Sequence, residues 1–155
     1  MPRTQTKSLA KPLTNDDYER LAELRYGLRR FLHWSSEQAR EAGITPTQHQ
    51  LLLAIRSSRD PRGPTITDVA EVLIIRHHSA VELIDRAQKA GLISRQRDPG
   101  QQSVVHLQLT DAGARTLGAL SAVHLRELAH LAPTMQTLFA ALGDIEAADL
   151  RLQRG

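Results

Sequence analysis

The sequence predicts a mainly α-helical protein with one small β-hairpin, and three observations support this fold class. Long segments near both ends carry apolar residues at the spacing of a helix face. Two short helical patterns in the middle are separated by a brief turn at Ile74-Ile75. Alternating apolar residues flank the turn-forming Asp98-Pro99-Gly100. The expected order is therefore four helices, a hairpin and two further helices.

Composition narrows the class of protein. The 155 residues are 41% hydrophobic and 24% charged, which is typical of a globular chain. The chain has no cysteine, so disulfides and cysteine-ligated zinc are excluded. No apolar run approaches membrane-spanning length and no leader pattern is present, so we expect a cytoplasmic protein. The net charge of +3 is only a weak indication of a polyanionic partner.

The N-terminal part divides into an arm and a helix. Residues 1–13 hold three cations and no acid, which predicts a flexible basic arm that is either a solvated tail or a DNA-contacting segment. Residues 14–44 predict a long helix, capped by Thr14 or Asn15 and ended by Gly43. Its apolar residues recur at helical or heptad spacing: Leu21, Leu24, Leu28, Phe31 and Leu32.

Residues 45–110 predict a compact middle domain. A second helix starts at Thr45-Pro46 and ends in a loop with three arginines, Arg56, Arg59 and Arg62. Thr67 is expected to cap a short third helix. A fourth helix runs from about His77 to Ala90, and its buried stripe is expected at Ala80, Leu83, Ile84 and Ala87. Strands at 92–95 and 104–109 complete the hairpin.

Residues 111–155 predict a fifth helix capped by Thr110, which Pro133 breaks or restarts as a sixth. The helices on both sides of the middle domain carry apolar stripes that a small domain cannot bury. A two-fold dimer is the commonest way to cover such stripes. We therefore expect residues 14–44 and 111–155 to be dimerisation helices of a homodimer.

Two short helices joined by a tight turn and followed by a hairpin define a winged helix-turn-helix, which suits duplex DNA. The free face of the fourth helix would lie in the major groove, where Val81 can touch a thymine methyl group and Glu82 can accept from cytosine. His77 and His78 could instead be exposed turn residues or respond to pH. The full predicted DNA-binding set is Thr47, Arg76, His77, His78, Ser79, Val81, Glu82, Arg86, Arg95, Arg97, Gln101, Gln102 and Ser103.

The order and spacing of several motifs in residues 45–113 resemble the MarR family of bacterial regulators. These motifs are Thr45-Pro46-Thr47-Gln48-His49-Gln50-Leu51-Leu52, Ile66-Thr67-Asp68-Val69-Ala70-Glu71, Leu83-Ile84-Asp85-Arg86, Ala90-Gly91-Leu92-Ile93-Ser94-Arg95 and Leu107-Gln108-Leu109-Thr110-Asp111-Ala112-Gly113. The resemblance implies a homodimer that binds a palindromic operator through its fourth helix and a wing at the minor groove. It also implies, in many members, a small aromatic ligand that weakens DNA binding.

One departure from the family pattern concerns the wing tip. The family usually has an Asp-x-Arg or Asp-Arg-Arg sequence there, and the matching positions hold Gln101, Gln102 and Ser103. Without a groove-inserted arginine, affinity and salt dependence should fall. Glu82 is also costly near DNA unless it reads a base. An alternative function is therefore a dimeric winged-helix interaction module or ligand sensor with weak or lost DNA binding.

Other kinds of site receive less support from the sequence. Tyr26, His33, Trp34 and His49 can gather into a ligand pocket, although ordinary packing between the first two helices is the favoured interpretation. His33 and Glu37 form one i, i+4 pair, which is too little to predict a metal site. No nucleophile elbow, phosphate loop or dinucleotide fingerprint is present, so we expect neither an enzyme nor a cofactor.

Overall fold

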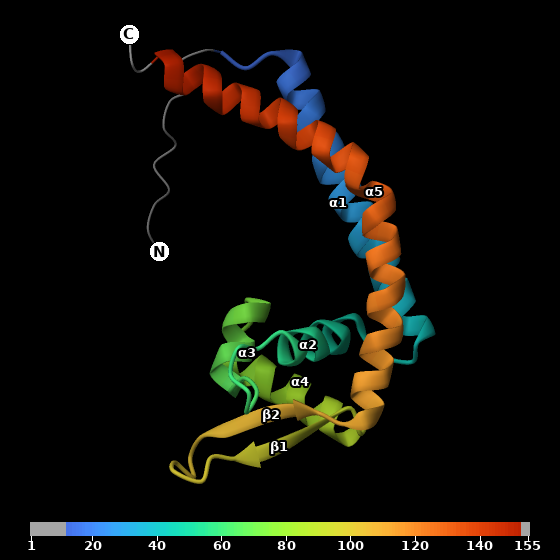
Figure 1. The fold of residues 1–155 in the computed structure, drawn as a ribbon, viewed down its shortest axis with the longest axis vertical. Helices are drawn as coiled ribbons and strands as arrows, with labels where there is room; N and C mark the ends of the chain where they lie inside the picture. Colours follow the sequence, from blue (N-terminus) through green and yellow to red (C-terminus); the bar gives the residue numbers. More distant parts are fainter. Residues whose placement is uncertain (1–11, 153–155) are drawn as a thin grey trace. The chain divides into compact units, whose positions relative to one another are not determined.

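A computed structural model describes residues 12–152, with side-chain surroundings as far as residue 140. It confirms the predicted fold class of a mainly helical chain with a two-stranded hairpin (Figure 1). The elements are α1 Asn15–Glu41, α2 Pro46–Arg56, α3 Ile66–Leu73, α4 His77–Lys89, β1 Ile93–Arg97, β2 Val105–Leu109 and α5 Asp111–Leu152. Residues 1–11, most of the predicted basic arm, lie outside the described residues.

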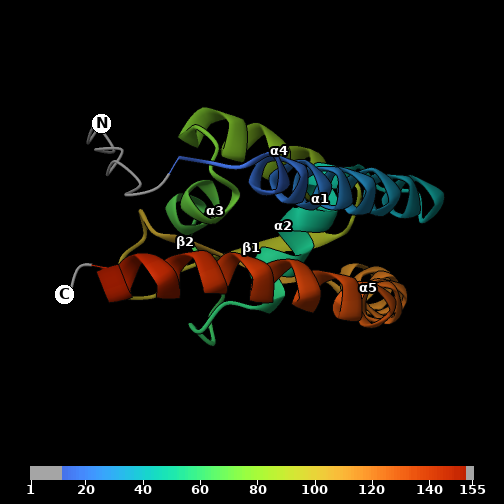
Figure 2. The ribbon, with the colours of Figure 1, turned by 90° about the horizontal axis from the view of Figure 1, so that it is seen from above.

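The chain forms two compact units, and residues 33–125 make up the larger one. In this lobe α2 contacts α3, α4 and β2, and α4 packs on both α3 and β1 (Figures 1 and 2). The strands pair antiparallel from Ile93 opposite Leu109 to Arg97 opposite Val105. The predicted stripe of α4 is confirmed, since Ala80, Leu83, Ile84 and Ala87 are all buried in the core.

Helix starts in the lobe are fixed by reciprocal capping. The predicted capping box of Thr45 and Gln48 at α2 is confirmed. The prediction for α3 was wrong by two residues, because Thr65 and not Thr67 is the cap. The Thr65 hydroxyl accepts from the backbone of Asp68, whose carboxylate accepts from the backbone of Thr65. Thr67 has Ala70 three residues later, which offers no acceptor in return.

The predicted helix break at Pro133 was also wrong, because α5 continues through it. An interior proline removes one helical hydrogen bond and crowds the preceding turn, at a cost of about 3 kcal/mol. The helix extends for several turns on either side, and a single lost bond does not interrupt it. The Thr137 hydroxyl donates to the Pro133 carbonyl oxygen at 3.0 Å. No helix within residues 12–152 has the length and apolar character needed to cross a membrane.

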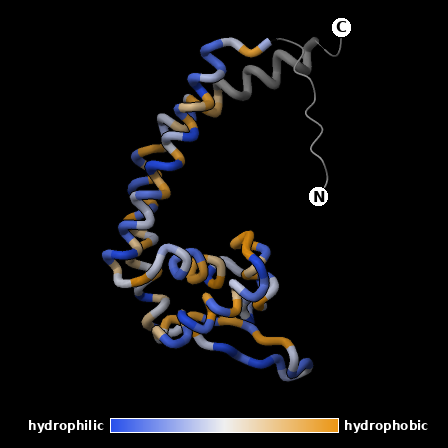
Figure 3. The backbone as a smooth tube through the Cα atoms, turned by 180° about the vertical axis from the view of Figure 1, so that it is seen from behind, coloured by the Kyte–Doolittle hydropathy of each residue, from blue (hydrophilic) through white to orange (hydrophobic). Residues whose placement is uncertain are grey.

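The described part of the second compact unit consists of residues 12–32, which include the first part of α1, and residues 126–152 of α5. Hydrophobic residues recur along residues 12–32 and 126–140 (Figure 3). Many stay exposed in the single chain, among them Leu21, Leu28, Leu32, Leu128 and Phe139. Large apolar side chains in such number on two helices mark surfaces that a partner can cover.

Candidate nucleic-acid interface

The exposed face of α4 lies opposite its buried stripe. His77, His78, Glu82 and Arg86 are exposed. Ser79 and Val81 are half-buried at the edge of this face. The structure therefore places these predicted residues on one helix and leaves them accessible. Thr47 is exposed on a different helix, α2, where its hydroxyl lies 3.2 Å from that of Thr45.

The N-terminal end of α4 favours anions. Arg76 occupies the N-cap position and makes no side-chain capping hydrogen bond, and the first turn contains no acidic residue. The first backbone N–H groups of a helix have no partner within the helix, and they carry the positive end of its dipole. Together with exposed Arg76, His77 and His78, this end has the chemistry of a phosphate contact.

The two wing arginines that the sequence grouped together differ in the structure. Arg95 is bound to α4, through Asp85 at 2.5 Å and the side chain of Gln88 at 2.7 Å. Arg97 is exposed, and within the described residues it makes no ion pair. Arg95 therefore fixes the hairpin to α4, while the side chain of Arg97 remains exposed to solvent. Gln101, Gln102 and Ser103 are exposed at the wing tip, as the sequence predicted for a polar tip.

A cluster of ionisable residues beside the wing was missed by the sequence reasoning. The Arg62 guanidinium makes two hydrogen bonds to Asp60, at 2.9 and 3.1 Å, and one to Asp98 at 2.6 Å. The hydrogen bonds from Arg62 lower the pKa of Asp60 to about 2. The pKa of Asp98 is also lowered, first by the backbone N–H of Gly100 and also by the charge of Arg62. The stabilisation from both ionised carboxylates is present above pH 3.8 and is lost as the pH falls through their lower folded-state pKa values.

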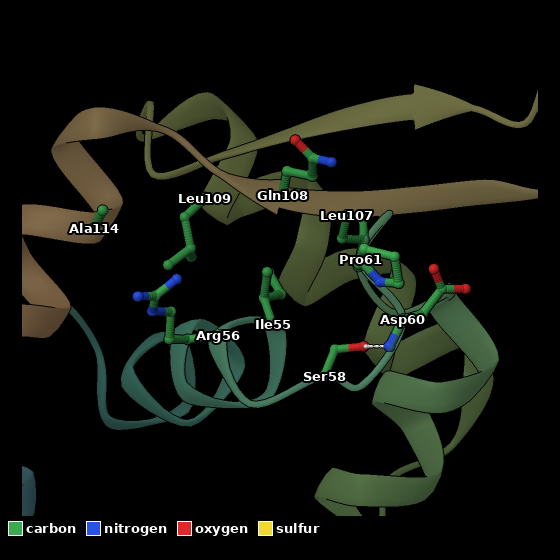
Figure 4. A pocket seen from close by; sticks show the side chains of 10 residues that line it. Ile55, Arg56, Ser58, Asp60, Pro61, Leu107, Gln108, Leu109 and Ala114 are labelled. Atoms are coloured by element: carbon green, nitrogen blue, oxygen red, sulfur yellow. Dashed lines mark hydrogen bonds between the residues drawn. The ribbon is translucent and has the colours of Figure 1, made fainter.

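A shallow pocket of about 380 Å³ lies next to this cluster. The end of α2, the following loop, β2 and the start of α5 line it, and Arg56 points across it toward Leu109 (Figure 4). Asp60 belongs both to the pocket wall and to the ion pairs. No local pattern in the sequence predicts this pocket, because its walls come from segments about 50 residues apart in the chain.

The predicted ligand residues are only partly brought together. The ring of His124 lies 4.9 Å from that of Trp34 and 4.7 Å from that of His49. His124 also bonds to the Leu120 carbonyl and to the Ser35 hydroxyl, each at 2.7 Å. His33 instead points to solvent and pairs with Glu37 at 3.5 Å. Tyr26 belongs to the other compact unit, where Arg30 lies over its ring.

His49 belongs to this cluster, and its pKa is shifted. Burial lowers its pKa below 6.5, and the charge of a protonated His124 lowers it further. His124 was not among the predicted ligand residues. Among the described residues, no group of three or more histidine and acidic side chains could hold a metal ion.

The helix pair, its exposed second helix and the attached hairpin define the class: this is a winged helix-turn-helix protein. Its middle part, residues 42–102, matches the sequence model of the MarR family, which confirms the resemblance seen in the motifs. A search against curated proteins found no match.

Solved structures support the same assignment of fold. AbsC from Streptomyces coelicolor, a MarR family transcriptional regulator, aligns with a TM-score of 0.70 at 16% identity over 94% of this chain and 99% of its own. MepR of S. aureus in complex with DNA aligns with a TM-score of 0.62 at 19% identity, over 80% of this chain and 96% of its own. A mutant MarR from E. coli complexed with operator DNA aligns with a TM-score of 0.64 at 19% identity, over 89% of this chain and 98% of its own. At these identities the likeness is one of fold.

Proposed function

We propose that this chain is a DNA-binding transcriptional regulator that works as a homodimer in the cytoplasm and recognises a palindromic operator. The observation that carries the proposal is the construction of α4, which is anchored by one buried stripe and exposes its polar and basic face. A helix held in this way can enter a major groove. MepR and the E. coli protein, which share the fold, were solved with DNA.

In this proposal each exposed group has a distinct task. Arg76, His77 and His78 contact phosphates at the end of α4, while Val81, Glu82 and Arg86 face base edges. Arg97 contacts the backbone from the wing. Thr47, Ser79 and the tip residues Gln101, Gln102 and Ser103 add neutral contacts. Arg95 contributes through its bonds to Asp85 and Gln88, which hold the wing beside α4.

The proposal includes dimerisation because one α4 reads only a half-site. The exposed apolar residues of α1 and α5 supply a surface for a second copy, and a two-fold dimer gives a palindromic site. A dimer seated on a promoter blocks polymerase, so repression is the proposed direction of regulation. We further propose that a small aromatic ligand, bound near Trp34, His49 and His124, releases the DNA.

The test begins with selection of duplexes from a random pool by the purified full-length chain. Fluorescence anisotropy on the most enriched duplex, with a scrambled duplex as the control, then gives affinity as a function of salt. The proposal predicts enrichment of a palindrome and affinity that falls steeply with salt. If no sequence is enriched and both duplexes bind equally weakly, the chain is instead an interaction module, as Ser103 and Glu82 suggested.

A further inference from the structure

The imidazole of His106 lies in an unusual environment on β2. The side chain is buried, and its Nδ1 lies 2.7 Å from the Gly63 carbonyl oxygen. A carbonyl oxygen only accepts, so the hydrogen of this bond belongs to Nδ1. The other nitrogen, Nε2, is buried and has no hydrogen-bond partner among the residues that the structure describes. It faces the Asp98 carboxylate, with 3.5 Å between Nε2 and Oδ2.

The protonation state of the ring decides whether both of its nitrogens can form hydrogen bonds. A neutral ring that donates from Nδ1 turns the Nε2 lone pair toward a carboxylate, which leaves a buried acceptor unpaired. A protonated ring carries hydrogen on both nitrogens and can donate to Gly63 and Asp98 together. The backbone N–H of Gly100 and, after it, the charge of Arg62 lower the pKa of Asp98, so the ionised carboxylate does not supply the missing proton.

Asp98 also controls the wing. Its Oδ1 accepts from the backbone N–H of Gly100 at 2.7 Å, and its own N–H donates to the Val104 carbonyl oxygen at 3.0 Å. The exposed tip, residues 101–103, lies between these bonds. The conformation of the tip is thus coupled to the position of Asp98, which Arg62 holds by a hydrogen bond.

The loop before α3 provides a fixed base for these bonds. The Leu107 N–H donates to the Pro64 carbonyl oxygen at 2.9 Å, and the Gln108 side chain donates to the Arg62 carbonyl oxygen at 3.2 Å. Gly63 lies so close to β2 that a Cβ there would overlap the Leu107 carbonyl oxygen. The loop is therefore joined to the hairpin by a backbone hydrogen bond and by a side-chain hydrogen bond.

We propose that Arg62, Asp98 and His106 form a clamp that orders the wing, and that the clamp is complete only when His106 is protonated. The charged groups around His106 are Asp60 and Arg62 from the loop and Asp98 from the hairpin, and Asp68 on adjacent α3 is bonded to Thr65. Wing order therefore falls as rising pH removes the second proton of His106. These three are positioning residues, and their effect on DNA binding rests on the proposed function.

The first test needs no DNA. Histidine ring nitrogens of the ¹⁵N-labelled chain and amide exchange of residues 98–104 are followed by NMR from about pH 5 to about pH 8.5. After correction for the intrinsic pH dependence of exchange, we expect protection of the wing to fall about tenfold as the His106 ring titrates. A His106 ring that is neutral throughout, or wing protection that does not follow its titration, would overturn the proposal.

Variants separate the clamp from ordinary folding. His106→Gln should abolish the pH dependence of wing protection, and His130→Gln, at an exposed position on α5, should retain it. If His106→Gln does not fold, Arg62→Gln replaces it, because the side chain of Arg62 is 57% exposed. Loss of this arginine should lower wing protection at every pH, and unchanged protection would refute the clamp.

DNA binding is then compared at the two ends of the pH range on the duplex enriched by selection. If the clamp positions the wing on DNA, the wild type should bind the duplex more tightly at low pH than at high pH. This difference in affinity should be absent in His106→Gln. A preference retained in full by a folded His106→Gln would contradict that extension. Failure of every variant to bind DNA would instead refute the proposed function, while the exchange data still decide on the clamp.

Discussion

At the scale of single residues, the wing tip offers a test of the proposed DNA contact. Ser103 is exposed at the position where the resembled family has a minor-groove arginine. Ser103→Arg should therefore strengthen binding to the selected duplex and steepen the plot of log affinity against log salt by about 0.9 for each new phosphate contact. Anisotropy at several salt concentrations measures both effects. Ser103→Gln is the neutral control, and an arginine variant that matches it would show that the tip does not reach DNA.

His49 provides a residue-scale prediction about stability. Its folded-state pKa is lowered, so its contribution to stability is present above its ordinary value of 6.5 and is lost as the pH falls through the lower folded value. Each unit of difference corresponds to about 1.4 kcal/mol. His49→Phe, which keeps a ring against His124, should lose less stability between about pH 7.5 and about pH 5 than the wild type. Urea unfolding at each pH tests this, and parallel curves for both proteins would contradict it.

The residue scale also shows which parts of the site the sequence can predict. The α4 face followed from a local rule, because residues at i, i+3, i+4 and i+7 share one side of a helix. The bond from Arg62 to Asp98 spans 36 positions, and that from His106 to Gly63 spans 43. No spacing rule connects residues so far apart, so these two contacts emerged only from the fold.

At the scale of elements, the turn between α3 and α4 contains a strained residue. Ile74 ends α3 with φ of 55°, a left-handed conformation that a β-branched side chain rarely adopts, and its side chain is 92% exposed. Ile74→Gly should raise the free energy of unfolding by about 1 kcal/mol, because little packing is lost and the strain is relieved. Urea denaturation tests this, with Ile74→Val as the control that keeps the branching. A glycine variant less stable than the wild type would contradict it.

The elements themselves were largely predictable, and the exceptions have physical causes. Caps, breakers and periodicity located the helices and the hairpin. Thr67 and Thr65 have the same side chain, and only the acidic residue three positions later distinguishes them. Pro133 was expected to end a helix, yet α5 is continuous on both sides of it. The cost of one proline does not end a helix when long stretches of sequence on both sides of it favour the helical conformation.

At the scale of the whole molecule, the exposed apolar residues of α1 and α5 predict an obligatory partner. Leu28 is 46% exposed in the single chain, and burial of a leucine contributes about 1.5–3 kcal/mol. Leu28→Glu should therefore shift the chain from dimer toward monomer in analytical ultracentrifugation. Glu23→Gln, a polar exposed position on the same helix, should remain dimeric. A wild-type chain that sediments as a monomer at about 10 µM would contradict the dimer.

The central claim is that the exposed face of α4 reads the sequence of duplex DNA. The most direct measurement is the ratio of dissociation constants for the scrambled and the selected duplex, compared between the wild type and the double variant His78→Ala/Arg86→Ala. Arg115→Ala, an exposed charge on α5, is the matched control. We predict that the ratio falls by about tenfold or more in the double variant and is unchanged in the control. An unchanged ratio in the folded double variant would mean that α4 does not read the DNA.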